Sequence, residues 1–160
     1  MSAVSLDLLI NDEVHTVWVE PHWTLLHVLR NVIGMTGTKE NCLEAECGVC
    51  TVLLDGAAVT SCILLALQCR GRRITTIEGL ANADRLDPLQ DAFIEYGSVQ
   101  CGYCIPGMIL TARSYLNENP GPHTAEEIRE GIAGTLCRCT GYQKIVDAVA
   151  AVAAAEGGIR

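Results

Sequence analysis

Nine cysteines in a chain of 160 residues constrain this sequence more than any other feature. Residues 1–10 contain no basic stretch followed by an apolar segment and a cleavage site, so we expect no secretion and a cytoplasmic location. Structural disulfides are rare among the reduced thiols of that compartment, and an odd number of cysteines also suits disulfide pairing poorly. The cysteines are therefore predicted to bind metal.

The first group of cysteines crowds three thiols into nine residues. Cys42, Cys47 and Cys50 have the spacing C-x4-C-x2-C, and Cys62 follows them. This spacing is typical of a plant-type [2Fe-2S] cluster, in which one tight loop supplies three thiolates and a neighbouring segment the fourth. A winding loop that contains Gly48 can turn backbone N–H donors toward the anionic cluster. Structural zinc and unliganded core cysteines are the alternatives, but zinc sites usually use two separate C-x2-C pairs.

Two further cysteine pairs lie in the second half of the chain, Cys101 with Cys104 and Cys137 with Cys139. Each pair is next to an expected helix end, and a helical bundle would bring the four thiolates together. Pro106 begins a helix directly after the first pair, with the positive end of the helix dipole toward the thiolates. The spacing leaves zinc, an iron-sulfur cluster and a redox-active C-x-x-C pair open.

The first half of the sequence is predicted to form a small mixed sheet with one helix. Alternating apolar residues mark the strands, and Asp55 with Gly56 marks a tight hairpin turn. The helix is expected after Thr24, a good N-cap residue. The expected strands cover residues 4–10, 14–19, 51–54, 57–59 and 74–77, and the expected helix covers residues 25–32.

The second half is predicted to form four helices, which at this length make a compact bundle. Pro88 and Pro106 suit the first turn of two of them, and Thr124 with Glu127 forms a capping box before a third. The third helix is expected to carry Leu136 on its apolar face and to end at the last cysteine pair. The last helix is expected from about residue 144.

Three segments carry motifs that go beyond the spacing of their cysteines. They are NCLEAECGVCTV at residues 41–52, QCGYCIPGM at residues 100–108 and LCRCTGY at residues 136–142. In this order, and over nearly the whole chain, they resemble the signatures of the small iron-sulfur subunit of molybdenum hydroxylases. That family includes xanthine dehydrogenases, aldehyde oxidoreductases and aerobic carbon monoxide dehydrogenases. The resemblance implies two [2Fe-2S] clusters and favours iron and sulfide at the second site.

The resemblance also implies an α+β architecture, in which a β-grasp domain of the plant-type ferredoxin kind precedes a four-helix-bundle domain. We expect the ferredoxin-like [2Fe-2S] domain over residues 1–78, a connection over residues 79–86 and the helical [2Fe-2S] domain over residues 87–160. The implied ligands are Cys42, Cys47, Cys50 and Cys62 in the first domain, and Cys101, Cys104, Cys137 and Cys139 in the second.

The function that the resemblance implies is electron transfer within a heteromeric molybdenum hydroxylase, by a subunit that is not itself catalytic. The helical-domain cluster would lie nearest the molybdenum-pterin site of a large subunit, with Gln100 and Cys139 as pterin contacts. A polar residue that faces solvent is the alternative reading of Gln100. The ferredoxin-like cluster would face the FAD of a medium subunit, and the expected assembly is a dimer of heterotrimers.

Charge and motif content argue against several other functions. The formal net charge of -8 disfavours nucleic-acid binding. The longest aliphatic run, residues 148–155, is far shorter than the roughly 20 residues of a membrane crossing. No catalytic triad, phosphate loop or dinucleotide fingerprint is present. A free soluble ferredoxin and a zinc-stabilised adapter are the remaining alternatives.

The first cysteine loop departs from the family pattern at Leu43 and Ala45, where relatives usually have glycine. A Cβ at a position of positive φ would cost about 1 kcal/mol or more. We therefore expect a slightly reshaped or more shielded loop, with a shifted cluster potential. Cys69 has no partner in either group and is predicted to be a small buried hydrophobe.

Overall fold

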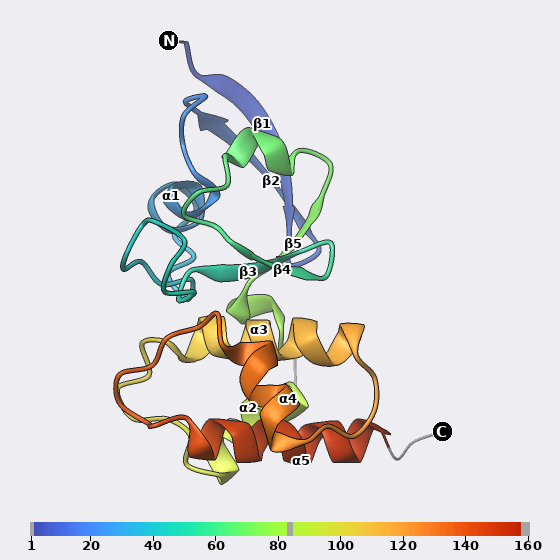
Figure 1. The fold of residues 1–160 in the computed structure, drawn as a ribbon. Coiled ribbons are helices and arrows are strands. Elements are labelled where there is room, and N and C mark those ends of the chain that lie inside the picture. The colour runs from blue at the N-terminus through green and yellow to red at the C-terminus, as the bar shows by residue number, and fades with distance from the viewer. Residues whose placement is uncertain (1, 83–84, 158–160) are drawn as a thin grey trace.

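The computed structural model describes residues 2–82 and 85–157. In the first half of the chain, five strands form a mixed sheet (Figure 1). Its strands are β1 (Val4–Ile10), β2 (Glu13–Val19), β3 (Thr51–Leu54), β4 (Ala57–Thr60) and β5 (Arg73–Thr75). The strand order is β2-β1-β5-β3-β4, with β1 and β5 parallel and the other neighbours antiparallel. The mixed sheet expected from the sequence is confirmed.

The hairpin predicted at Asp55 and Gly56 forms, and the turn between β1 and β2 forms in the same way, around residues with positive φ. The turn between β1 and β2 contains Asn11 and Asp12, with φ of 51° and 67°. The turn between β3 and β4 contains Asp55 and Gly56, with φ of 52° and 90°. Two successive residues of this kind give a turn whose twist matches that of the paired strands. Local turn chemistry therefore places the hairpins.

The helix predicted over residues 25–32 forms only in part as an α-helix. α1 covers Leu25–His27, and the hydroxyl of Thr24 accepts the N–H of His27 at 3.2 Å, as its role as N-cap requires. The chain then continues as a π-helix over Val28–Ile33. Over six residues an apolar pattern does not distinguish i→i+4 from i→i+5 hydrogen bonding, so the sequence did not reveal the wider turn.

The core of the sheet layer is aliphatic. Its largest members are Leu6, Leu8, Ile10, Leu25, Leu29 and Ile74. Cys69 is fully buried among them, which confirms its prediction as a small hydrophobe.

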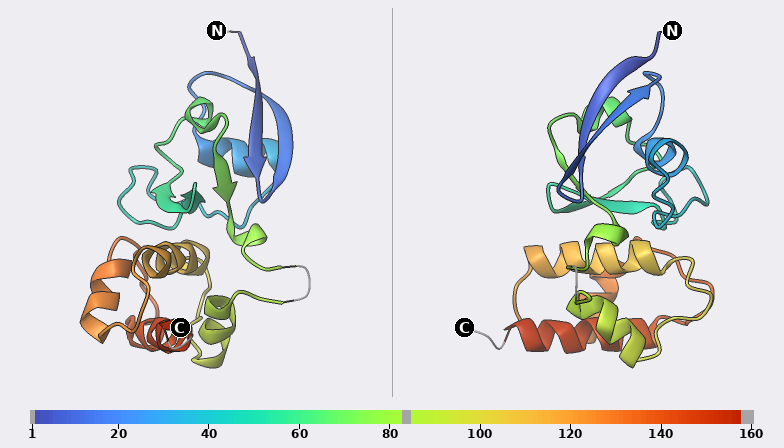
Figure 2. Two further views of the ribbon diagram at one scale, coloured as in Figure 1. Left: turned by 90° about the vertical axis from the view of Figure 1, so that its right-hand side faces the viewer. Right: turned by 180° about the vertical axis from the view of Figure 1, so that it is seen from behind.

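The helices of the second half pack together in a layer beside the sheet (Figures 1 and 2). They are α2 (Pro88–Glu95), α3 (Ile105–Glu118), α4 (Ala125–Ile132) and α5 (Gln143–Gly157). Capping boxes begin α2 at Asp87 and α4 at Thr124. Their shared core includes Phe93, Met108, Ile128, Ile145 and Val149.

The predicted end of α4 is wrong. The helix stops at Ile132, so Leu136 lies beyond it with 54% of its surface exposed. Cys137 and Cys139 therefore lie in the following loop and not at a helix end. The cause is tertiary, because the N–H of Leu136 donates to the carbonyl of Cys47 at 2.9 Å and the chain must leave the helix to reach it.

The two layers meet closely where α3 crosses the first cysteine loop. A Cβ added at Gly107 would lie 2.5 Å from the carbonyl oxygen of Gly48 and 3.0 Å from that of Val49. Cys47 and Val49 are buried in the core of the helical layer. The segment predicted as the connection, residues 79–86, includes residues 83–84, which lie outside the described part of the chain, as do residues 1 and 158–160 of the predicted domains.

Within the described residues, no helix has both the length and the apolar character that a membrane crossing requires.

Candidate metal centres

The first cysteine loop winds through residues with left-handed backbone conformations. Leu43, Ala45 and Gly48 have φ of 62°, 61° and 68°. The expectation of strain is confirmed at both non-glycine positions, and each costs about 1–2 kcal/mol. A chain that keeps this shape despite the cost is held by its surroundings, and this is common at functional sites.

The winding turns backbone N–H groups toward the sulfur of Cys42. The N–H of Glu44 lies 3.5 Å from this sulfur. Hydrogen bonds from the Glu44 N–H, and from the side chain and N–H of Cys47, lower the pKa of Cys42 to about 7. The loop therefore stabilises a thiolate, the form of cysteine that binds metal.

The fourth cysteine of the first group is held beside the third. The hydroxyl of Ser61 donates to the carbonyl of Cys50 at 2.7 Å and so fixes the start of the segment that carries Cys62. Both cysteines are buried, and burial raises the pKa of Cys50 to about 11. Cys50 is in hydrogen-bonding contact with Cys62, while Cys42 makes the same contact with Cys47.

The second group is also arranged in pairs. The sulfurs of Cys101 and Cys139 are 3.5 Å apart, and both residues are exposed. Cys104 is buried and in hydrogen-bonding contact with the half-buried Cys137. Burial raises the pKa of Cys104 to about 12. Burial also opposes ionisation of Cys137, but hydrogen bonds from Thr140, Cys139 and Cys104 together outweigh it and lower the pKa.

The pairwise arrangement of the thiols matches the ligand requirement of a two-iron cluster. Structural zinc takes four ligands around one ion. In a [2Fe-2S] cluster each of the two irons takes two protein ligands. Two pairs of thiols in each group match that requirement.

Direct contacts join the loops of the two groups. The N–H of Leu136, next to Cys137, donates to the carbonyl of Cys47 at 2.9 Å. The hydroxyl of Tyr103 donates to the carbonyl of Glu40, just before the first loop. One hydrogen bond therefore connects the backbone of a predicted ligand in the first group to the residue that precedes a predicted ligand in the second.

Gln100 and Cys139 both lie on the exposed side of the second group. Gln100 directly precedes Cys101, which touches Cys139. Both residues are therefore open to solvent. The contact of these two residues with a pterin stays a prediction.

Sequence reasoning missed Thr140 and Tyr142, which support the second group. The hydroxyl oxygen of Thr140 lies 3.1 Å from the sulfur of Cys137. The phenol oxygen of Tyr142 accepts the N–H of Cys137 at 2.7 Å. Their position inside the LCRCTGY motif was the available signal, but the pattern alone does not reveal which atoms they contact.

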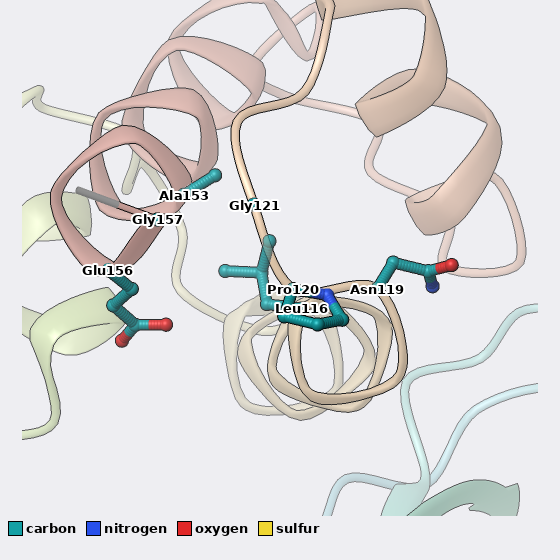
Figure 3. A pocket seen from close by; sticks show the side chains of 7 residues that line it. All are labelled: Leu116, Asn119, Pro120, Gly121, Ala153, Glu156 and Gly157. Carbon is teal, nitrogen blue, oxygen red and sulfur yellow. The ribbon is translucent and has the colours of Figure 1, made fainter. Parts of the chain in front are cut away.

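The pocket in Figure 3 does not belong to either cysteine group. It is lined by Leu116, Asn119, Pro120, Gly121, Ala153, Glu156 and Gly157. Leu116 and Asn119 are at the C-terminal end of α3, whereas Cys104 caps its N-terminal end. A helix of 14 residues is about 21 Å long, which separates the pocket from the thiols.

The fold and its paired cysteines define a class, the iron-sulfur proteins. The family described as "[2Fe-2S] binding domain" matches residues 76–150. The nicotinate dehydrogenase small FeS subunit of Eubacterium barkeri is 48% identical over 149 residues, which are 93% of this chain and 94% of that protein. The xanthine dehydrogenase iron-sulfur-binding subunit of Escherichia coli O157:H7 is 42% identical, over 91% of this chain and 92% of that one.

Solved structures agree with these relatives. Quinoline 2-oxidoreductase from Pseudomonas putida 86 matches with a TM-score of 0.90 and 45% identity, over 96% of this chain and 94% of that chain. Aldehyde oxidoreductase from Desulfovibrio gigas matches with a TM-score of 0.90 and 37% identity, over 98% of this chain but 18% of that one. The chain belongs to the family of small iron-sulfur subunits of molybdenum hydroxylases, as its three motifs indicated.

Proposed function

We propose that this chain is the electron-transfer subunit of a heteromeric molybdenum hydroxylase. It relays electrons one at a time between the molybdenum-pterin site of a large subunit and the FAD of a medium subunit. The observation that carries the proposal is the division of eight cysteines into four thiol pairs, two pairs in each group. When bound, a [2Fe-2S] cluster supplies a one-electron carrier, and two such carriers suit a donor that releases two electrons.

The proposed cluster ligands are the eight cysteines outside the sheet core. Cys42, Cys47, Cys50 and Cys62 hold one cluster in a ferredoxin-like β-grasp domain, residues 1–78. Cys101, Cys104, Cys137 and Cys139 hold the other in a helical-bundle domain, residues 87–160, after a connection at residues 79–86. Backbone N–H groups around Cys42 and the Thr140 hydrogen bonds to Cys137 favour thiolates in both sets.

The exposure of the thiols supports an assignment of the partner subunit that each cluster faces. Cys101 and Cys139 are exposed, so their side of the helical domain can approach the pterin, with Gln100 and Cys139 as the contacts. Cys42 is the least buried thiol of the first group, and Leu43 beside it is 53% exposed. We assign this side to the flavin subunit.

Apolar side chains around the exposed thiols support docking onto a partner. Val99, Tyr103 and Leu136 are 43%, 47% and 54% exposed, and each lies within two residues of a proposed ligand of the helical domain. Exposed apolar groups gathered around a functional site are typical of an interaction surface. Relatives are named the small subunit of nicotine 6-hydroxylase and subunit beta of a dehydrogenase complex, which supports a multi-subunit assembly, for which we propose a dimer of heterotrimers.

Metal analysis of the chain purified under anaerobic conditions tests this function. We expect about four irons and four acid-labile sulfides per chain, with no zinc, because each [2Fe-2S] cluster contains two of each. We also expect two larger chains to co-purify from the native host. Zinc without sulfide would contradict the proposal and favour an adapter, and an iron-loaded chain that purifies alone with full activity would favour a free ferredoxin.

A further inference from the structure

The hydroxyl and the backbone N–H of Thr140 both contact the sulfur of the same cysteine. Its hydroxyl oxygen is 3.1 Å from the sulfur of Cys137, and its N–H donates to that sulfur at 3.5 Å. Thr140 is half-buried in the loop between the last cysteine and α5. The backbone contact is available to any residue at this position, whereas the hydroxyl contact requires serine or threonine.

The surroundings of Thr140 fix the direction of its hydroxyl proton. The N–H of Tyr142 donates to the hydroxyl oxygen of Thr140 at 3.2 Å, so that oxygen already acts as an acceptor. A thiolate that ligates metal carries no proton and acts only as an acceptor. The proton of the Thr140 hydroxyl therefore points to the sulfur of Cys137.

This arrangement requires left-handed backbone conformations in the loop that follows Thr140. Gly141 and Tyr142 have φ of 66° and 67°, and at tyrosine this conformation costs about 1–2 kcal/mol. The two left-handed residues turn the N–H of Tyr142 back to Thr140 while its phenol oxygen accepts the N–H of Cys137 at 2.7 Å. Strain of this kind persists where the local structure serves a function.

We propose that Thr140 is a positioning residue whose hydroxyl raises the reduction potential of the helical-domain cluster through its hydrogen bond to Cys137. The inference rests on the proposed function. Reduction adds one electron to the cluster and makes its sulfurs more negative, with no bond made or broken and no proton transferred. A donor aimed at a ligand sulfur therefore stabilises the reduced state more than the oxidised state.

The effect is selective for one of the two clusters. The hydroxyl of Thr140 contacts Cys137 and none of the cysteines in the first group. Cys42, in that group, receives its donors from the backbone, beginning with the N–H of Glu44. A change confined to the Thr140 side chain should therefore move the potential of the helical-domain cluster and leave the other potential in place.

A potentiometric titration followed by electron paramagnetic resonance tests this proposal on the full chain in its complex. In Thr140→Val we expect the equilibrium constant for reduction of the helical-domain cluster to fall roughly tenfold, which for a one-electron couple is about 59 mV. Thr140→Ser keeps the hydroxyl and should stay within about twofold of the wild type. A Cys139→Ser variant, which replaces a thiolate ligand, identifies the helical-domain signal independently.

Thr111→Val is the matched control. The hydroxyl of Thr111 pairs with that of Thr135 at 2.9 Å and not with a sulfur, so the same chemical change should leave both potentials in place. Equal midpoints in the wild type and Thr140→Val would overturn the proposal. If Thr140→Val does not retain the cluster, the titration is repeated with Thr140→Ala. Loss of the cluster in both variants would also overturn the proposal, because the hydroxyl would then be needed for cluster assembly.

The outcomes separate this proposal from the function on which it rests. A wild-type protein without two [2Fe-2S] signals would contradict the proposed function itself. A wild type with both signals, and a Thr140→Val variant with an unshifted midpoint, would contradict only the role of Thr140.

Discussion

Leu43 and Ala45 show that single residues in the first cysteine loop carry a conformation that glycine would adopt at lower cost. Both have left-handed φ, yet the N–H of the residue between them still reaches the sulfur of Cys42. Leu43 and Ala45 therefore raise the conformational cost of this loop, while its expected reshaping and the shift in cluster potential stay predictions. The sequence allowed this cost to be anticipated, because the motif fixed where glycine was missing.

Replacing Leu43 by glycine should stabilise the loop. Leu43 is 53% exposed, so little packing is lost, while relief of the strain exceeds the entropic cost of glycine. We expect a gain of about 0.5–1 kcal/mol, measured as a higher guanidinium midpoint for the loss of the visible absorbance of the cluster. Leu43→Ala, which keeps the Cβ, should show no such gain, and equal midpoints for the two variants would refute the assignment of strain.

At the scale of elements, local sequence signals determine some features of the fold and tertiary contacts determine others. The hairpin turn at Asp55 and Gly56 and the helix starts after Thr24, at Pro88 and after Thr124 follow from short-range chemistry, so the sequence located them. The end of α4 depends on a hydrogen bond from Leu136 to Cys47. Because these two residues are far apart in the sequence, no local pattern predicts where the helix ends. The spacing likewise grouped the cysteines, but their pairing and the role of Thr140 depend on left-handed loop residues.

The crossing of α3 over the first cysteine loop should not tolerate a side chain at Gly107. A Cβ there would meet the backbone oxygens of Gly48 and Val49, which cannot rotate away. For Gly107→Ala we expect a loss of about 1–3 kcal/mol, seen as a melting temperature several degrees lower, and a lower iron content.

Gly134→Ala is the control for that prediction, because a Cβ at Gly134 would meet no atom within 4 Å. Its melting temperature and iron content should match the wild type. An unchanged Gly107→Ala variant would mean that the sheet and helical layers are not in close contact at this point.

At the scale of the whole molecule, the loops that carry the two cysteine groups lie on the same side, where the sheet meets the helical layer (Figures 1 and 2). The Leu136 to Cys47 hydrogen bond joins them directly. The exposed thiols Cys101 and Cys139 remain accessible on the helical layer. In the proposed relay, electrons enter at one group and leave at the other, and the hydrogen bond between the two loops keeps the groups close together.

Docking onto the large subunit should depend on the apolar residues around the exposed thiols. For Leu136→Asp we expect at least roughly tenfold weaker association with the partner subunits, measured by titration of the purified subunits, because a buried charge without a partner opposes binding. The iron content should be unchanged, since the Leu136 side chain is not a ligand. Val14→Asp, at an apolar residue that is 68% exposed on β2, is the matched control and should bind normally. Equal weakening by both changes would contradict the assigned surface.

Electron paramagnetic resonance of the dithionite-reduced wild-type protein, compared with Cys139→Ser, tests most directly whether the eight paired thiols hold two separate clusters. We expect two distinct [2Fe-2S] signals in the wild type, each integrating to about one spin per chain. The ligand change should alter one signal and leave the other intact. A single signal, or a change in both signals from the one substitution, would contradict the account.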